Sequence, residues 1–229
     1  QLYIADGHHR YETALNYRRE AEERRHGLSL DDAANFVMMA LIDIADPGFL
    51  VLPTHRLLFG LSAEMLAKLT AEQLARYFTV QELANTTGSE ELVKMLERSG
   101  KEQPSLAIST SERGLLLAIN EQGRARMAES GHSEAWNNLD VAIAQMLVLE
   151  DLLGISQQEM TAGMYVRFTS EANTALQAVR AGKAQAALLL NAMPLRQVRD
   201  VALADDRMPQ KSTYYYPKLI TGLVINPLW

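Results

Sequence analysis

The stretch MYVRFTSEANTALQAVRAGKAQAALLL, residues 164–190, decides the fold that the sequence predicts. It predicts a strand at Met164–Phe168, a helix at Ser170–Ala181 and a second, apolar strand at Ala184–Leu190. A helix between two short strands is typical of a parallel strand pair in a partly buried sheet. We therefore expect an α+β fold with mixed sheets and flanking helices.

The residues around this unit predict further elements of the same kind. Asp140–Leu153 is rich in Leu and Met at core spacing and predicts a strong helix, and Leu195–Ala204 predicts another after a proline. The tail predicts a strand at Lys211–Lys218, a turn, and a last strand at Gly222–Asn226.

The middle of the chain has a different character. Two amphipathic helices are expected at Ser62–Tyr77 and Ser89–Gly100, and they alternate with short strands at Phe78–Leu83, Ser105–Thr110 and Leu115–Asn120. This part contains no cluster of catalytic residue types. We expect residues 61–138 to form an inserted or lid-like subdomain, and residues 1–60 and 139–229 to form the main body.

The beginning of the chain predicts a strand at Leu2–Ala5 that breaks at Asp-Gly into a helix at Tyr11–His26. The apolar run Asn35–Ile44 turns back at Asp-Pro-Gly into Phe49–Leu52, which predicts a buried hairpin. Because the chain has no initiator Met and starts at a strand, we expect it to be the C-terminal part of a longer polypeptide, a fragment whose missing N-terminal region is a partner.

Composition limits the classes of function. The 229 residues are 48% hydrophobic and 22% charged, as in an ordinary globular protein, and the net charge of −6 makes nucleic acid an unlikely partner. The chain has no Cys, so disulfides and Cys-based metal or thiol chemistry are excluded, and a cytoplasmic location is expected. The longest apolar runs fall short of the roughly 20 residues of a membrane span, so no membrane partner is expected.

The first candidate site is Asp6-Gly7-His8-His9-Arg10, where the expected strand gives way to a helix. Backbone N–H groups at a helix N-terminus attract anions, and the Arg10 guanidinium is suited to a phosphate group. Gly7 permits a tight turn, while Asp6 can cap the helix or help to hold a cation. The structural alternative is an ordinary cap with surface histidines.

A metal site in the same segment is disfavoured. Adjacent histidines on a helix point about 100° apart, so only His9 and Glu12 share a face. Two ligands do not complete a structural metal site, whereas Mg²⁺ that arrives with a nucleotide needs only one or two carboxylates.

Two further segments are candidates. His55 and Arg56 follow an expected strand end, where α/β proteins place site residues, although such a pair is also common as surface decoration. Lys211 and Thr213 are expected on one face of the tyrosine-rich strand and would complete an anion site. Asn191, directly after the strand Ala184–Leu190, is a weaker candidate for the same reason of position.

The strings YIADGHHRYETAL, NFVMMALIDIADPGFLVLPTHR and MPQKSTYYYPKLITGLV closely resemble a widespread prokaryotic family of unknown function, domain-of-unknown-function family 1015. The resemblance runs through essentially the whole chain and implies bacterial-type relatives that are longer at the N-terminus. It implies no activity.

The segment Gly7–Tyr11 also resembles the phosphate-binding box of the ParB and sulfiredoxin superfamily, some members of which phosphorylate free serine. The resemblance implies phosphate contacts at Gly7 and Arg10, and His9 matches the histidine of the sulfiredoxin version. His8 stands where sulfiredoxins have a catalytic Cys and ParB proteins have Glu. Sulfinic-acid repair is thereby excluded, and a CTP-dependent DNA clamp is put in doubt.

These features lead to one main hypothesis, a nucleotide- or phosphate-binding protein that acts as a small-molecule phosphotransferase. Gly7, His8, Arg10, Lys211 and Thr213 would bind phosphate, and His9 or Glu12 would act as general base; Asp6, His55, Arg56 and Asn191 are additional candidates. The cofactor would be a nucleotide with Mg²⁺, and no resident metal is expected. The alternatives are a non-catalytic ligand-binding module and a ParB-like nucleic-acid adaptor.

Overall fold

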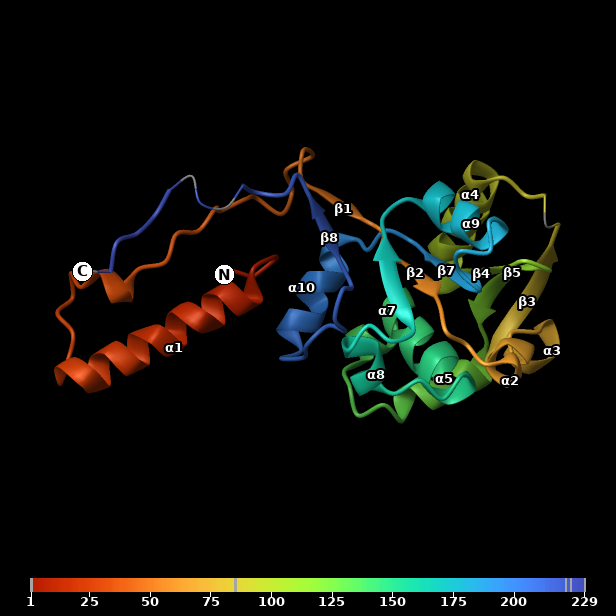
Figure 1. Ribbon diagram of the computed structural model, residues 1–229, viewed down its shortest axis with the longest axis horizontal. Coiled ribbons are helices and arrows are strands. Elements are labelled where there is room, and N and C mark those ends of the chain that lie inside the picture. The colour runs from red at the N-terminus through yellow and green to blue at the C-terminus, as the bar shows by residue number, and fades with distance from the viewer. Residues whose placement is uncertain (1, 85, 221, 223, 229) are drawn as a thin grey trace. The chain divides into compact units, whose positions relative to one another are not determined.

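The structure is a computed structural model, and it describes residues 2–84, 86–220, 222 and 224–228 (Figure 1). The chain forms two compact units. Unit 1 comprises Gln1–Leu50 and Tyr215–Trp229, and unit 2 comprises Val51–Tyr214. These bounds differ from the division at residues 60 and 138 that the change of character in the sequence suggested.

Unit 2 is built on an antiparallel sheet that has six strands within its described residues, in the order β3-β5-β4-β7-β2-β6 (Figure 1). In chain order they are β2 (His55–Leu58), β3 (Phe78–Leu83), β4 (Ser105–Thr110), β5 (Gly114–Ile119), β6 (Val166–Thr169) and β7 (Ala186–Leu190). Helices cover both faces of the sheet. The expected α+β class with flanking helices is confirmed.

The expected parallel pair of β6 and β7 is wrong, because β2 lies between them. Leu57 of β2 faces Arg167 of β6 on one side and Ala187 of β7 on the other, and both pairings are antiparallel. The local spacing sets a helical crossover between two strands but leaves open whether a third strand occupies the gap. Here a strand from much earlier in the chain fills it.

The two faces of the sheet bury different side chains. On β4, Leu106 and Ile108 belong to a core cluster that includes Leu147 of the π-helical segment η2 (Ala144–Leu152). Ala107, between them, points to the opposite face, where α4 (Ser89–Glu102) and α9 (Ala172–Arg180) pack. This alternation follows from the two-residue period of a strand.

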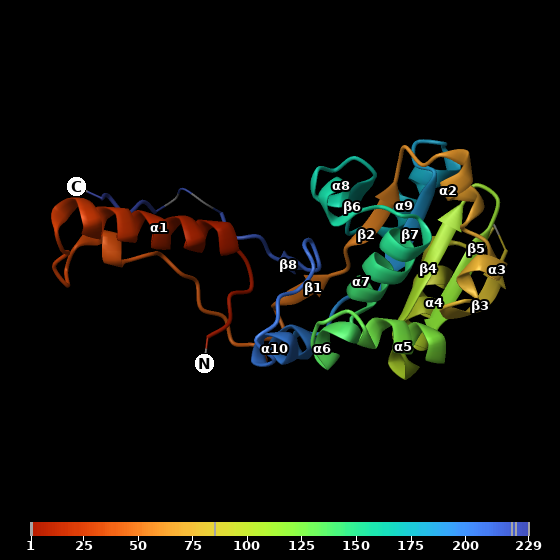
Figure 2. The same ribbon diagram turned by 90° about the horizontal axis from the view of Figure 1, so that it is seen from below.

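The remaining helices of unit 2 are short. Helix α6 lies between α5 and α10 (Figure 2). Their bounds are α2 (Ala63–Ala67), α3 (Ala71–Leu74), α5 (Glu121–Ala128), α6 (Glu134–Asn137), α7 (Asp140–Ile143), α8 (Gln157–Thr161) and α10 (Leu195–Leu203). Among the described residues, no helix has both the length and the apolar character needed to cross a membrane.

Several expected helices differ in detail. Ser62 caps a helix as predicted, by accepting a 3.2 Å hydrogen bond from Met65 N. The single helix expected at Ser62–Tyr77 is instead α2 and α3, because the Thr70 side chain caps a new helix. The helix expected from Asp140 begins there as α7 and continues as η2, in which Met146 is buried as predicted.

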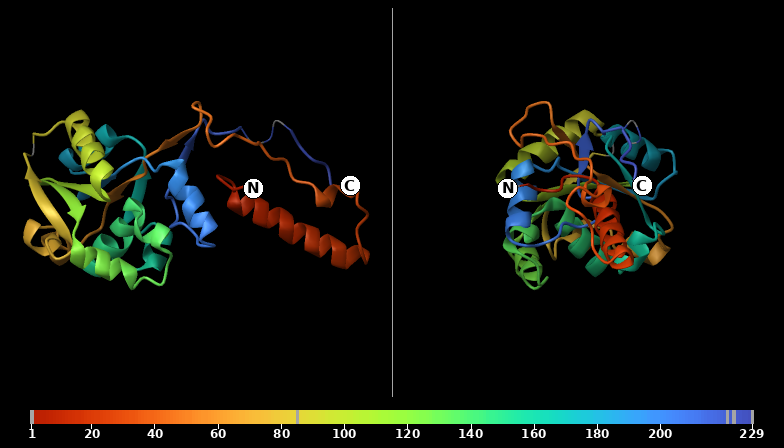
Figure 3. Two further views of the ribbon diagram at one scale, coloured as in Figure 1. Left: turned by 180° about the vertical axis from the view of Figure 1, so that it is seen from behind. Right: turned by 90° about the vertical axis from the view of Figure 1, so that its left-hand side faces the viewer.

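Unit 1 contains α1 (His8–Arg25), a single uninterrupted helix, and the 3₁₀ turn η1 (Ala33–Asn35) (Figure 3). An ion pair of 2.6 Å joins Arg25 to Asp32, and Arg18 donates a 2.9 Å hydrogen bond to Asn35. These contacts hold the turn against the helix.

The apolar run of unit 1 does not form the expected hairpin. Residues 36–44 contain no strand and expose side chains such as Met38 and Leu41, and residues 2–5 are not a strand either. The strand β1 (Leu50–Leu52) pairs instead with β8 (Tyr214–Tyr216). An apolar run becomes a buried strand only where other segments supply backbone partners and cover both faces, which the described part of unit 1 does not do.

The C-terminal tail also differs from expectation. The expected strand at Lys211–Lys218 is reduced to β8, in which Tyr215 is buried and its two neighbours are exposed. The described residues of the range 222–226 form no strand, and position 223 lies outside the described residues. Tyr215 stacks on Phe49 with 5.2 Å between the ring centroids.

Candidate functional site

The N-terminus of α1 has the geometry of an anion site. Gly7 is the N-cap, in the left-handed conformation with φ 83°, and the first helical hydrogen bond runs from Tyr11 N to Gly7 O at 3.0 Å. The first turn contains no acidic residue, and no side chain of the described residues caps it. The N–H groups and positive dipole end of the helix are thus not neutralised from within the first turn.

The Arg10 side chain folds back over this end of the helix. A Cβ placed on Gly7 would lie 2.9 Å from Arg10 Nη2 and 3.1 Å from its Nε. The absence of a side chain at position 7 is therefore what lets the guanidinium approach the start of the helix. The structure brings Gly7 and Arg10 together, as the sequence predicted.

The neighbouring side chains differ in what they contact. His9 Nδ1 lies 3.4 Å from Glu12 Oε2, as the i,i+3 spacing predicted, and the His9 ring is 98% exposed. His8 is also exposed. Among the described residues no group of three or more His, Asp and Glu side chains converges on a metal-sized space.

Asp6 serves the turn and an ion pair. Its Oδ1 accepts a 2.9 Å hydrogen bond from Gly7 N, and its Oδ2 lies 3.0 Å from Lys218 Nζ. Partial burial raises the pKa of Asp6, but Lys218, the Gly7 amide and Arg10 outweigh it and leave the pKa below its ordinary value. The carboxylate next to the helix end is thus charged but partly neutralised by Lys218.

The segment Thr54-His55-Arg56 is buried, whereas the sequence suggested that it emerges at a strand end. His55 and Arg56 begin β2, inside the sheet, and are 2% and 3% exposed. His55 Nδ1 accepts a 3.2 Å hydrogen bond from Leu190 N. Desolvation, with a smaller effect of the Arg56 charge, lowers the pKa of His55 to about 4, so the ring is neutral and serves the sheet.

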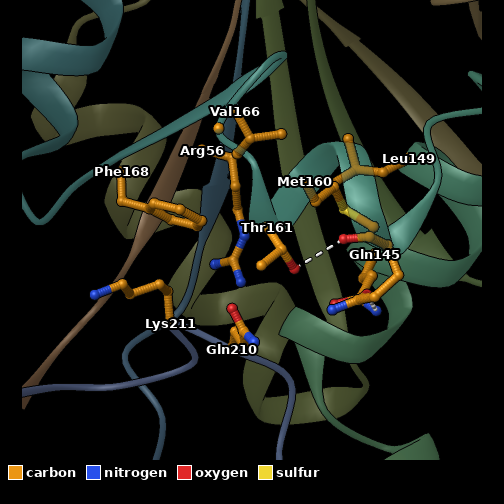
Figure 4. Close-up of a pocket in the computed structure, with 11 residues that line it drawn as sticks. Arg56, Gln145, Leu149, Met160, Thr161, Val166, Phe168, Gln210 and Lys211 are labelled. Atoms are coloured by element: carbon orange, nitrogen blue, oxygen red, sulfur yellow. Dashed lines mark hydrogen bonds between the residues drawn. The ribbon is translucent and has the colours of Figure 1, made fainter.

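Arg56 lies on the face of β2 opposite to His55 and lines a pocket of about 130 Å³ in unit 2 (Figure 4). Its Nη1 donates to the carbonyl and the hydroxyl of Thr54, and its guanidinium carbon lies 5.5 Å from the Phe168 ring centroid. Desolvation lowers the pKa of Arg56 to about 10, and the group remains a cation at neutral pH.

The pocket is formed by four parts of unit 2: β2, the η2–α8 region, β6 and the loop that leads to β8. Its polar lining, apart from Arg56 and Lys211, consists of amide and hydroxyl groups, and its apolar lining comes from the helices and β6. These residues are Gln145, Gln157, Thr161 and Gln210 on the polar side and Leu149, Met160, Val166 and Phe168 on the apolar side.

Lys211 lines this pocket, but it is not on a strand as expected. It occupies a turn with φ 55°, and its side chain is exposed. A hydrogen bond within unit 2 stabilises this turn: Thr54 Oγ1 donates to Ser212 O at 3.3 Å. Thr213 is partly buried and is not part of the pocket lining.

The Asn191 side chain takes part in hydrogen bonds that join elements of the fold. Its Nδ2 donates a 2.9 Å hydrogen bond to Asp140 Oδ2, whose Oδ1 accepts one of 3.1 Å from Ser105 N. This network joins the end of β7 to the start of α7 and of β4, and it does not line the pocket.

Sequence reasoning missed most of the pocket lining. Gln145 lies in an expected helix and Phe168 in an expected strand, whereas no element was predicted for the segment of Met160. Local sequence patterns carry no signal of a cavity. Gln210 had a signal, since it precedes Lys211. Of the predicted residues, Arg56 and Lys211 meet in unit 2, while Asp6, Gly7, His8, His9, Arg10 and Glu12 belong to unit 1.

Known structures of moderate similarity exist. A free serine kinase in complex with AMP matches at a TM-score of 0.48 with 13% identity, over 93% of this chain and 66% of that one. A mutant of free serine kinase with ADP matches at 0.46 with 14% identity and the same coverage. A conserved hypothetical protein from Pyrococcus furiosus matches at 0.47 with 14% identity, over 93% of this chain and 68% of that one.

The chain thus spans 66% of the length of these free serine kinase structures. No curated protein matches it by sequence. The family model described as "Protein of unknown function (DUF1015)" matches residues 1–142, which is more than half of the chain. The chain belongs to the DUF1015 family.

Proposed function

We propose that this chain binds the phosphate groups of a nucleotide at the N-terminus of α1. The observation that carries the proposal is the folded-back guanidinium of Arg10 beside Gly7, at a helix end with no acid in its first turn. A left-handed glycine, helix N–H groups and an arginine together form an arrangement suited to phosphate oxygens.

The electrostatics of this segment favour an anion. The helix dipole contributes the equivalent of about half a positive charge, and Arg10 adds a full one. The nearest carboxylate in the sequence, Asp6, is paired with Lys218 and so repels an incoming anion less. His8 and His9 are exposed on the first turn and offer ring N–H donors to the same ligand.

The same segment contains groups for phosphoryl transfer to a small hydroxylated acceptor. His9 and Glu12 form an exposed pair at 3.4 Å, and either can accept the proton of the acceptor hydroxyl. A bound nucleotide would supply the phosphoryl group, and Mg²⁺ held with it would neutralise phosphate charge. Asp6 and Glu12 are the carboxylates of this segment that would contact such an ion.

The test is binding and turnover with defined nucleotides. Isothermal titration of the chain with ATP, ADP and CTP, each with Mg²⁺, is expected to show saturable binding. In the Arg10→Met variant, affinity falls about tenfold or more, because a charge-assisted contact is lost. Arg19→Met is the matched control, since Arg19 is an exposed cation farther along α1, and it leaves affinity unchanged.

Turnover separates a phosphotransferase from a non-catalytic ligand-binding module. The chain is incubated with ATP, Mg²⁺ and a panel of hydroxylated metabolites, and phosphorylated products are sought by mass spectrometry. Binding without any product would favour the ligand-binding module. Absence of nucleotide binding, or equal affinity of the wild type and Arg10→Met, would overturn the proposal.

A further inference from the structure

Arg56 is a buried cation that has no anionic partner among the described residues. Only 3% of its surface is exposed, and no Asp or Glu of the described chain lies within ion-pair distance of it. An unpaired buried charge destabilises a fold by several kcal/mol unless other groups compensate it. The position therefore calls for a counter-charge.

The protein contacts of the guanidinium leave part of it available. Nη1 donates to both oxygens of Thr54, and the cation lies 5.5 Å from the Phe168 ring centroid. Within the described residues Nε and Nη2 have no hydrogen-bond acceptor. Figure 4 shows the guanidinium pointing into the pocket, between the Thr161 and Gln210 side chains. Two adjacent N–H donors of this kind fit two oxygens of one oxyanion.

The rest of the lining agrees with an anionic ligand. The described lining of the pocket contains two cationic residues and no Asp or Glu, although acidic residues outnumber basic ones in the whole chain. The Lys211 ammonium extends away from the guanidinium in Figure 4, and its exposed, flexible stem allows it to turn toward a bound anion. The absence of a carboxylate also makes the pocket a poor site for the ammonium group of a zwitterion.

The pocket wall beyond the guanidinium indicates which kind of anionic ligand would fit. Gln145 donates a 2.7 Å hydrogen bond to Gln157, and Thr161 lies on the same helix, so this wall offers fixed amide and hydroxyl groups. Met160 supplies apolar surface on the side of this wall, and Phe168 supplies it on the opposite side of the guanidinium (Figure 4). A small molecule with one anionic end and a short uncharged polar body matches this order of groups.

We propose that this pocket is a second ligand site, which binds the phosphate group of a small phosphate monoester between Arg56 and Lys211. Two cations match the two negative charges of a monoester better than the single charge of a carboxylate. The inference is independent of the nucleotide proposal, because the pocket lies wholly in unit 2 and Gly7 and Arg10 belong to unit 1.

The experiment measures ligand binding by the resonance of a residue that lines the pocket. The chain is labelled with ¹³C at the methionine methyl groups, and inorganic phosphate, glycerol 3-phosphate and acetate are each titrated at constant ionic strength. The methyl resonance of Met160, assigned with Met160→Leu, is expected to shift saturably with both phosphates and less with acetate. Met38 and Met39, which belong to unit 1 and do not line the pocket, serve as control resonances.

Variants identify the groups responsible. Arg56→Met, which keeps the side-chain length without the charge, abolishes the Met160 shift or weakens binding at least about tenfold, and Lys211→Met weakens it about fivefold. Lys183→Met, which removes an exposed lysine outside the lining, changes nothing. If Arg56→Met fails to fold, Arg56→Lys, which loses the two-pronged geometry, and Lys211→Met decide the question.

Three results would overturn the inference: a Met160 resonance that phosphates do not move, an unchanged affinity in both Lys211→Met and the folded Arg56 variant, or tighter binding of acetate than of either phosphate. The Arg10→Met chain serves as a separate arm. If phosphate still shifts the Met160 resonance in Arg10→Met while nucleotide binding is lost, the two sites are distinct. Loss of nucleotide binding in this variant therefore does not contradict the pocket proposal.

Discussion

The side-chain amide of Asn191 occupies the space directly above Gly100, so that a Cβ on Gly100 would overlap Asn191 Nδ2. The same amide donates a 2.9 Å hydrogen bond to Asp140. Gly100 lies in the last turns of α4, and Asn191 directly follows β7. The small residue therefore permits a close approach of α4 to Asn191, which bonds to Asp140 and does not line the pocket.

This contact predicts strong coupling between the two positions. Gly100→Ala is expected to destabilise the chain by about 1–2 kcal/mol through overpacking. In an Asn191→Ala background the same change is expected to stabilise it by about 0.5–1 kcal/mol, because alanine is the better helix former. Urea unfolding of the four chains measures the coupling, with exposed Lys101→Ala as control. Additive effects would contradict the proposed overlap.

Asp140 predicts a pH dependence of stability. Burial raises the pKa of Asp140 to about 6 from an ordinary 3.8, although hydrogen bonds from Asn191 and Ser105 oppose the shift. The folded chain then holds this proton more tightly than the unfolded chain. Stability falls as the pH rises from about 4 to about 6, by on the order of 2 kcal/mol, and is level above that window.

The measurement is urea unfolding at several pH values across that window. Asp140→Asn, which cannot titrate, is expected to remove the slope even though it loses one hydrogen bond. Glu97→Gln, on the exposed face of α4, is expected to retain it. An equal slope in Asp140→Asn and in the wild type would show that another group is responsible.

Asp206 predicts a pH dependence of stability with the opposite sign. Burial raises its pKa, but hydrogen bonds from Ser133 N at 2.8 Å, from His132 and from Arg207 N outweigh burial and hold the pKa well below its usual range. The stabilisation is complete above pH 4 and is lost as the pH falls below it. Asp206→Asn is expected to lower stability at pH 7 by about 1–3 kcal/mol, and much less at pH 2.

Thermal unfolding at both pH values checks this expectation. The neighbouring change Asp205→Asn is the control, because Asp205 is exposed in a left-handed conformation that asparagine adopts readily. A loss of stability in Asp206→Asn that is equal at pH 2 and pH 7 would contradict the assignment.

Comparing Gly7→Ala with Gly27→Ala separates an effect on nucleotide affinity from an effect on stability. Gly7→Ala strains a backbone with φ 83° by about 1–2 kcal/mol and displaces the Arg10 guanidinium. Nucleotide affinity is therefore expected to fall together with the melting temperature. Gly27→Ala also strains a positive φ, at the other end of α1 and with no atom near the new Cβ. It is expected to lower the melting temperature only, which calorimetry and titration can establish on the same samples.

The charge of the chain predicts weak affinity for nucleic acid. With a net charge of −6, duplex DNA is expected to bind weakly even at low salt, without the steep salt dependence of a protein that neutralises many phosphates. Fluorescence anisotropy with labelled DNA at 20 and 200 mM salt measures this. Tight, steeply salt-dependent binding would instead favour a ParB-like adaptor.

Local patterns in the sequence predicted much of unit 2. The strands at Phe78–Leu83 and Ser105–Thr110 have the predicted bounds, and α10 follows Pro194 as expected. Period-two alternation, caps and proline are local signals, and they act over a few residues wherever a segment lies. For the same reason Gly7, Arg10 and the His9–Glu12 pair could be recognised as neighbours.

Tertiary structure decided what local patterns leave open. The apolar run 36–44 has the composition of a buried strand, yet its strand character depends on partners and cover that the described part of unit 1 does not provide. The position of β2 between β6 and β7 depends on which strands meet through space. Arg56 and Lys211 share a pocket for the same reason.

The sequence by itself determined the α+β class, many of the elements and the proximity of Gly7 and Arg10 at the start of α1, because each rests on contacts between near neighbours in the chain. Only the tertiary structure showed that Arg56 is buried with no carboxylate of the described residues beside it, that His55 and Asn191 serve the sheet, and that Lys211 belongs to a turn. Burial and pairing are properties of segments distant in sequence that come together on folding, and no local pattern encodes them.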